Sequence, residues 1–288
     1  MAGELIRYDL SMAGYFSYPP APAVRTRPMI PRGEPRSLFM RGEFGEKADG
    51  SALRPMTAHN TTHLDVPYHF DAAGDDLAAV LNRVDSVADR PCLARVLCLA
   101  GDPALPGAHT REGVTYCEAV SAAVLPPVAE LRACEALVLL TGFGAVMARY
   151  ADRPFTQDGD GYYHVPWLTD DATGHVLAAG LRLVALDSTS VERQTSSVPH
   201  RMSGDVHSAL LTHRPPVLIV ECLDGSALAG QVGFVPREAL LHLVPRRVNA
   251  AGADAAHSRA FLYFYRDDPA GSALRRLQAA LTPQELYG

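Results

Sequence analysis

The sequence of 288 residues predicts a single α/β domain with a mixed sheet and flanking helices. Three observations support this class. Five short apolar runs have the length of strands and are bounded by glycine, proline or aspartate. Helical patterns lie between these runs, and such alternation is typical of α/β domains. No stretch of linker composition divides residues 1–288, so we expect one domain.

The expected elements can be placed along the chain. The five strands are expected over 94–100, 136–141, 181–186, 217–223 and 260–265. Four helices are expected over 169–179, 205–213, 237–243 and 272–281. The first helix has two acidic residues in its first turn and Gly180 after its end, which favours a C-cap there. Residues 12–58 contain many prolines and glycines with little periodicity, so we expect a loop-rich N-terminal arm that serves as a lid or an interface.

Composition excludes several classes of protein. The chain has 26 Lys and Arg against 32 Asp and Glu, which gives no basic surface for nucleic acid. No run of about 18 apolar residues predicts a membrane span, and residues 1–10 do not form a secretory signal. The five cysteines include no CxxC pair, and Cys98, Cys134 and Cys222 lie in apolar runs, so we expect them to be buried thiols. A cytoplasmic location is therefore expected.

Histidine is the residue type that stands out. Three of the 11 histidines, His59, His63 and His69, lie within eleven residues, together with Asp65. A helix would place the first two on one face, but Thr61, Thr62 and Pro67 disfavour a helix here. In an extended chain, side chains alternate with period two, so positions 59, 63, 65 and 69 would share one side. We therefore expect three imidazoles and a carboxylate to converge.

These side chains suit a metal ion. Imidazole and carboxylate groups bind zinc, manganese and iron, and two His with one Asp leave a coordination position open. We expect His59, His63 and Asp65 to form such a set. His69 has three possible roles: a fourth ligand, a ring that orients Asp65, or a general acid/base. We favour the acid/base role.

The segment resembles the signature of the metal-dependent cyclase-like hydrolases, the family of bacterial kynurenine formamidase and isatin hydrolase. The family pattern is His-x-Gly-Thr-His-x-Asp-x-Pro-x-His, and its specified positions are matched here by His59, Thr62, His63, Asp65, Pro67 and His69. Thr61 departs from the pattern, where the family has glycine. Weaker likenesses occur at 9–11, 140–143, 185–190, 207–211 and 217–221. The resemblance implies a mixed sheet with flanking helices in a swivelling β/β/α-like fold.

The resemblance also implies roles for individual residues. His59, His63 and Asp65 are expected to bind metal, and in two-metal relatives Asp65 would bridge to a second ion held by His207 and Glu221. The ion would be zinc or manganese, in one or two copies. A homodimer or homotetramer is expected as well. The other seven histidines are assigned no role.

Three functions remain open at this stage. The first is metal-dependent hydrolysis of an amide, formamide or lactam C–N bond in an aromatic small molecule, with His69 moving the proton. The second is a metal-dependent cyclase that acts on a polyketide or another intermediate of secondary metabolism. The third is a binding module without catalysis, which the departure at Thr61 suggests.

Overall fold

The computed structural model describes residues 3–12, 59, 61–83, 85–88, 90–150, 155–193, 204–228, 235–246, 252–268 and 272–280. Apart from Met12, the expected arm at 12–58 lies outside the described residues. Within the described part of the chain, no helix is long and apolar enough to cross a bilayer.

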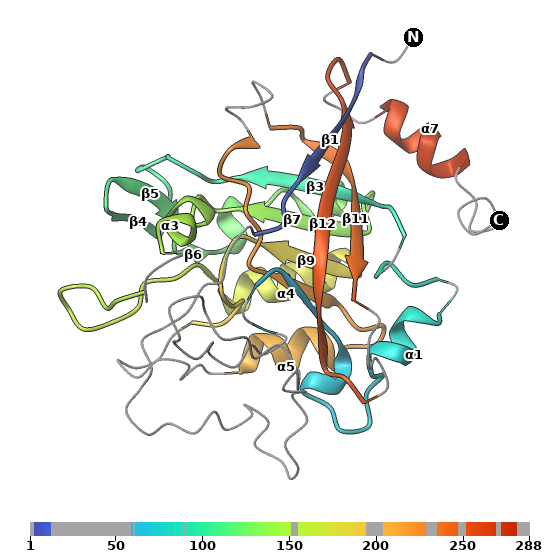
Figure 1. The fold of residues 1–288 in the computed structure, drawn as a ribbon, viewed down its shortest axis with the longest axis horizontal. Coiled ribbons are helices and arrows are strands. Elements are labelled where there is room, and N and C mark those ends of the chain that lie inside the picture. The colour runs from blue at the N-terminus through green and yellow to red at the C-terminus, as the bar shows by residue number, and fades with distance from the viewer. Residues whose placement is uncertain are drawn as a thin grey trace, which may run out of the picture.

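The centre of the fold is a sheet that closes on itself (Figure 1). Its strands are, in spatial order, β1 (Leu5–Asp9), β12 (Ala255–Tyr265), β11 (Glu238–Pro245), β3 (Cys92–Cys98), β7 (Ala136–Leu140), β9 (Leu183–Leu186), β10 (Leu218–Glu221) and β2 (His63–Asp65). Because β12 also pairs with β2, the strands from β12 to β2 form a closed ring, and β1 extends it from β12. The ring is mixed, since β3, β7, β9 and β10 are parallel and their other neighbours are antiparallel. The predicted α/β class with a mixed sheet is confirmed.

The parallel strands form the core because both of their faces are covered. Every residue of β7, β9 and β10 is buried. Continuous burial explains why these strands appear in the sequence as unbroken apolar runs rather than alternating ones. The helices α2 (Val128–Leu131), α4 (Asp170–Ala179) and α5 (Asp205–Leu211) pack in series, and α5 lies against β10. This contact brings the face of α5 to the carboxyl end of β10.

The remaining elements are short. They are the strands β4 (Ala108–Arg111), β5 (Val114–Cys117), β6 (Ala119–Val120) and β8 (Trp167–Leu168), the helices α1 (Leu77–Leu81), α3 (Gly144–Arg149) and α7 (Ser272–Ala280), and the 3-10 turns η1 (Pro67–His69) and η2 (Ala122–Val124). The β4–β5 hairpin and α3 lie at one edge of the molecule (Figure 1). A second, aromatic core of buried residues fills this edge, including Tyr116, Phe143 and Phe155.

Several predicted helix boundaries are confirmed by the capping groups. In α4, the Thr169 side chain accepts a hydrogen bond from the backbone N–H of Ala172, and Gly180 has a left-handed φ of 71°. Glycine adopts that conformation without the steric cost that a Cβ brings, so the helix ends there. The expected helices at 205–213 and 272–281 correspond to α5 and α7.

Two expectations are wrong. Residues 237–243 form most of strand β11 rather than a helix. An apolar run buried on both sides has no period-two alternation, so it cannot be distinguished from a short helix by periodicity. Pairing with β12 on one side and β3 on the other decides the outcome. In addition, Cys98 at the end of β3 is exposed, whereas Cys134 and Cys222 are buried as expected.

Candidate metal centre

Strand β2 supplies the first two candidate ligands. His63 and Asp65 lie on the same face of β2, and both are fully buried. Pairing between β10 and β2 places Glu221 opposite His63. As a result, His63 Nε2 lies 3.3 Å from Glu221 Oε2 and 3.5 Å from Asp65 Oδ1. His63 and Glu221, which are 158 positions apart in the chain, thus meet through one antiparallel pairing.

His59 and His69 reach the same place by a different route from the one expected. Only His63–Asp65 is a strand, and Pro67–His69 is a 3-10 turn, so simple alternation along 59–69 does not describe this segment. The turn stacks the His69 ring on the His59 ring, with 4.6 Å between their centroids. His59 Nδ1 lies 3.1 Å from Asp65 Oδ1. The predicted convergence is confirmed, although the backbone geometry behind it differs.

Helix α5 brings His207 into the cluster. His207 is 2% exposed, and its Nε2 lies 3.3 Å from Glu221 Oε1 and 3.7 Å from Asp65 Oδ2. Its other ring nitrogen, Nδ1, lies 3.1 Å from Glu192 Oε1. The same Glu192 oxygen accepts the backbone N–H of His207 at 2.7 Å, so Glu192 holds both the helix start and the ring.

Thr61 does not strain the backbone. Within the described residues, the non-glycine positions with positive φ are Glu112 and Cys222, so Thr61 has an ordinary conformation. Its carbonyl oxygen lies 2.7 Å from His63 Nδ1. A carbonyl can only accept, so Nδ1 carries a proton, and Nε2, which faces Asp65 and Glu221, is the nitrogen that could bind an ion once it gives up its own proton. The replacement of glycine by threonine is therefore compatible with a ligand at His63.

Two buried acids complete the cluster, and the sequence analysis missed both. Asp254 Oδ2 lies 3.0 Å from His69 Nδ1 and 3.7 Å from His59 Nε2. Glu192 is the partner of His207 described above. No motif or spacing in the sequence links position 254 to position 69. The two residues meet in space only because strand β12 pairs with strand β2. The only available signal is that a buried acid needs a partner.

The charges in this cluster depend on one another. Burial by itself would lower the pKa of His59, but Asp65 and Asp254 outweigh it and raise that pKa to about 9. Burial would raise the pKa of Asp65, but the neighbouring His63 and His59 hold it well below its ordinary value. In the same way, His207 and His63 overcome burial and lower the pKa of Glu221 to about 2. Protons on the imidazoles thus balance the carboxylates, and a cation could take over that task.

His69 is the exception among these histidines. Burial and the neighbouring charge of His59 lower its pKa, and the hydrogen bond to Asp254 only partly offsets them. His69 is therefore neutral around pH 7. Since the Asp254 carboxylate accepts a hydrogen bond from Nδ1, the lone pair lies on Nε2.

The donor atoms fit a metal ion. One donor each from His59, Asp65 and His69 lie within 4.8 Å of one another, as do one donor each from His63, Asp65 and Glu221. Asp65 belongs to both sets. Both of its oxygens and His63 Nε2 are buried and make no hydrogen bond of good geometry with the described residues. Buried polar atoms in that state are costly unless an ion satisfies them.

The contacts of the ring nitrogens that face away from the cluster are also typical of metal-binding histidines. His63 and His207 each have one ring nitrogen held by an oxygen acceptor and the other directed at the carboxylates. Metal-binding histidines are usually fixed in this manner by a carbonyl or carboxylate. The residues present therefore fit a divalent ion bound by imidazole and carboxylate groups.

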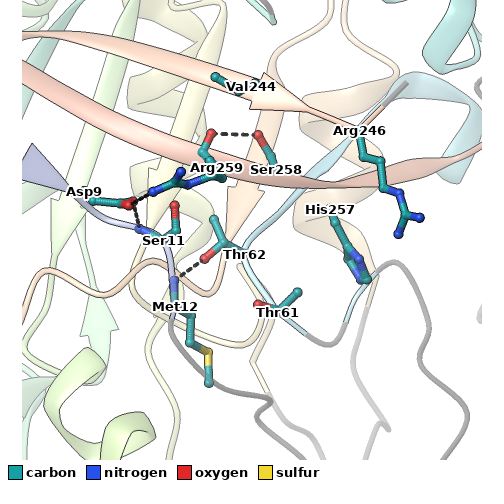
Figure 2. A pocket seen from close by; sticks show the side chains of 10 residues that line it. All are labelled: Asp9, Ser11, Met12, Thr61, Thr62, Val244, Arg246, His257, Ser258 and Arg259. Atoms are coloured by element: carbon teal, nitrogen blue, oxygen red, sulfur yellow. Dashed lines mark hydrogen bonds and ion pairs between the residues drawn. The ribbon is translucent and has the colours of Figure 1, made fainter. Parts of the chain in front are cut away.

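A separate cavity of about 490 Å³ lies next to this segment (Figure 2). Thr61 and Thr62 line it together with Ser11, Ser258 and Arg259, among others. Figure 2 shows the Arg259 guanidinium directed toward Asp9, with which it forms an ion pair. None of the six histidine, aspartate and glutamate side chains of the predicted site lines this cavity. We therefore assign it no part in the chemistry of the centre.

Comparisons with known proteins bear on the fold and on the family of the chain. Among solved structures, a potential metal-dependent hydrolase with cyclase activity matches with a TM-score of 0.51 and 15% identity, covering 90% of this chain and 98% of the other. A novel cyclase matches with a TM-score of 0.50 and 16% identity, covering 91% and 89%. An isatin hydrolase bound to the product analogue thioisatinate matches with a TM-score of 0.48 and 15% identity, covering 77% of this chain and 79% of the other. At these identities the first two support the fold alone.

The sequence itself gives the family. No curated protein matches it significantly. The family model described as "Putative cyclase" matches residues 8–193, which is more than half of the chain. This range includes the histidine segment, the β7 end and the Asp187–Ser190 region on which the resemblance rests. The chain therefore belongs to the cyclase family.

Proposed function

We propose that the chain is a metal-dependent hydrolase that cleaves an amide, formamide or lactam C–N bond in an aromatic small molecule. The observation that supports this most strongly is the hydrogen bond between His69 and Asp254 beside the buried carboxylate of Asp65. His59 and His63, which both lie within 3.5 Å of Asp65 Oδ1, would hold a zinc or manganese ion together with Asp65, and His207 and Glu221 would hold a second ion with the same Asp65. A bound ion supplies Lewis acidity, which lowers the pKa of water and polarises a carbonyl group.

His69 can move the proton that this reaction requires. Its Nδ1 donates a hydrogen bond to Asp254, so Nε2 is available to accept a proton from the attacking water. Asp254 then stabilises the imidazolium that forms, because the carboxylate lies 3.0 Å from the ring. The same Nε2–H can next protonate the departing nitrogen. Each of these transfers uses a histidine whose lowered pKa keeps it neutral before the reaction.

An aromatic substrate is supported by the rings around the centre. Phe70 stacks on His207 with 5.0 Å between ring centroids and an interplanar angle of 13°. It also meets the edge of His69 at 4.9 Å. Phe70 is half-buried, so its ring covers two functional imidazoles and excludes water from one side of them. A flat aromatic molecule could pack against such a wall.

The alternative is a cyclase that removes a proton from carbon in a polyketide or a similar intermediate of secondary metabolism. The family description favours it, and a neutral His69 could accept a proton from carbon as well as from water. Turnover of N-formyl aryl amines or isatin-like lactams supports hydrolysis. Turnover of an extended polyketide alone supports cyclisation. The homodimeric or homotetrameric state and the cytoplasmic location stay predictions.

Substitution of His69 tests the proposed role. With zinc- or manganese-supplemented protein, we expect His69→Ala to lose most turnover of the lactam or formamide substrate while it still folds and binds metal. The matched control is His175→Ala, because His175 contacts the carbonyl of Pro126 on another part of the surface. Full turnover by His69→Ala would overturn the acid/base assignment.

A further inference from the structure

A second cluster of histidines and carboxylates lies at the edge of the molecule that holds the β4–β5 hairpin. His109 is on β4, Glu118 follows β5, and His164 precedes β8. One donor atom from each lies within 4.8 Å of the others. In Figure 1 this edge is well separated from α5, which carries His207. No motif in the sequence predicts a role for these histidines.

Both imidazoles present Nδ1 to the same carboxylate. His164 Nδ1 lies 3.0 Å from Glu118 Oε1, and His109 Nδ1 lies 3.7 Å from Glu118 Oε2. The two rings stack with 4.4 Å between their centroids and an angle of 11°. A tetrahedral ion with bonds of about 2.1 Å needs its donor atoms about 3.4 Å apart. The two separations between Nδ1 and the Glu118 carboxylate, 3.0 and 3.7 Å, lie on either side of this value, so an ion could bind there with small side-chain adjustments.

The outward-facing nitrogens have carboxylate partners of their own. His164 Nε2 lies 2.8 Å from Asp160 Oδ2, and His109 Nε2 lies 3.5 Å from Asp158 Oδ2. Arg111 Nη1 in turn lies 3.0 Å from Asp158 Oδ1 and holds that carboxylate in place. A carboxylate accepts the Nε2–H and leaves the lone pair on Nδ1, which is the usual arrangement behind a metal-binding histidine. The hydrogen bond is formed at His164, whereas at His109 the 3.5 Å contact with Asp158 is too long or poorly aligned to be one.

The charges of the cluster also favour a cation. It holds three carboxylates, those of Glu118, Asp158 and Asp160, and one guanidinium, that of Arg111, which pairs with Asp158. Two protonated imidazoles would balance the excess negative charge, but they would then stack face to face as like charges. One divalent ion supplies the same charge between two neutral rings. Asp158 Oδ2 is buried without a well-aligned donor among the described residues, and a His109 ring fixed by an ion would supply one.

We propose that His109, His164 and Glu118 bind a divalent transition-metal ion, with zinc as the best match to two imidazoles and a carboxylate. The ion ties the loop before β8 to the β4–β5 hairpin. That loop turns at Gly161, where Asp158 N–H donates to the Tyr162 carbonyl at 2.9 Å, and Phe155 anchors its start in the aromatic core. The site is structural, and water completes its coordination because the three side chains are partly exposed.

Zinc titration of chelator-treated protein tests the proposal without any enzyme assay. Calorimetry and elemental analysis count the zinc ions bound by wild type, His109→Ala, His164→Ala and the control His175→Ala. We expect each of the first two variants to bind one zinc fewer than wild type and the control to bind the same number. Equal numbers in all four proteins would overturn the proposal.

Two further variants keep the test decisive. Glu118→Gln preserves side-chain shape, so it should lose the same zinc equivalent even if an alanine variant folds poorly, as circular dichroism would reveal. Asp158→Asn removes a partner of His109 rather than a ligand, and its zinc affinity at this site should fall about 10- to 100-fold. Asp65→Asn should lose zinc at the first centre and keep the equivalent at the hairpin. Retention of full affinity by Glu118→Gln would contradict the assignment.

Discussion

The contact between His69 and Asp254 gives the sharpest prediction about the chemistry of the centre. Asp254→Asn keeps the size of the side chain but removes the charge that lies 3.0 Å from His69 Nδ1. A hydrogen bond to a charged group contributes about 1.5–3 kcal/mol. If that stabilisation is needed for the imidazolium in the transition state, its loss lowers kcat about 10- to 160-fold, at 1.36 kcal/mol per decade.

The same substitution should change the pH profile. Asp254 partly offsets the burial that lowers the pKa of His69, so the asparagine variant should lower this pKa further. A neutral His69 is the active form for proton abstraction, so the acidic limb of kcat/KM should move to lower pH. Histidine NMR of the metal-loaded protein provides a second measurement of the same pKa.

Turnover of an isatin-like lactam by the metal-loaded protein is the assay. The control is Asp224→Asn, because the Asp224 carboxylate accepts the backbone N–H of Ser226 at 3.1 Å and stabilises only a turn. The reasoning is refuted if Asp254→Asn keeps full kcat with an unmoved acidic limb. A loss of kcat with an unmoved limb would show that Asp254 acts only on structure.

Three further outcomes are expected. Glu192→Gln removes the charged acceptor of the His207 ring, so the zinc affinity of the first centre, measured by calorimetry, should fall about 10- to 100-fold. An unchanged affinity would show that Glu192 does not support His207 as a ligand. The pKa of His59 is raised in the metal-free protein, so its stabilising effect is complete below pH 6.5 and is lost as pH rises toward 9. Calorimetric melting temperatures should therefore fall across this window, and a flat profile would show that His59 carries no stabilising proton. Leu139→Ala, in the fully buried strand β7, should lower the free energy of unfolding measured in urea by about 2–5 kcal/mol. Val244→Ala should have little effect because Val244 is 48% exposed, and equal losses of stability in the two variants would argue against a core built on β7.

Local chemistry explains what could be predicted from the sequence. His63 and Asp65 share a face because strand alternation alone places them there, and the apolar runs of β7 and β9 identify core strands without knowledge of their neighbours. Gly180 ends α4 where its conformational freedom predicts. Each of these features depends on interactions within a few residues.

The rest depends on pairings between distant segments. The ring closes because β12 pairs with β2, and this contact carries Asp254 to His69 from 185 positions away. Nothing near either residue in the sequence indicates the other. For the same reason β11 was assigned to a helix, since only its neighbours β12 and β3 distinguish a buried strand from a helical turn. The cluster at His109 likewise joins a hairpin to a loop that follows it by about 50 residues.

Anomalous diffraction from crystals grown with zinc shows whether the buried cluster around Asp65 binds a metal ion. We expect an anomalous peak about 2.0–2.2 Å from the Asp65 carboxylate and from a nitrogen of His63, with His59, His207 and Glu221 around it. Well-ordered density for these side chains with no anomalous peak among them would rule out a metal centre there, even if the His109 site held zinc.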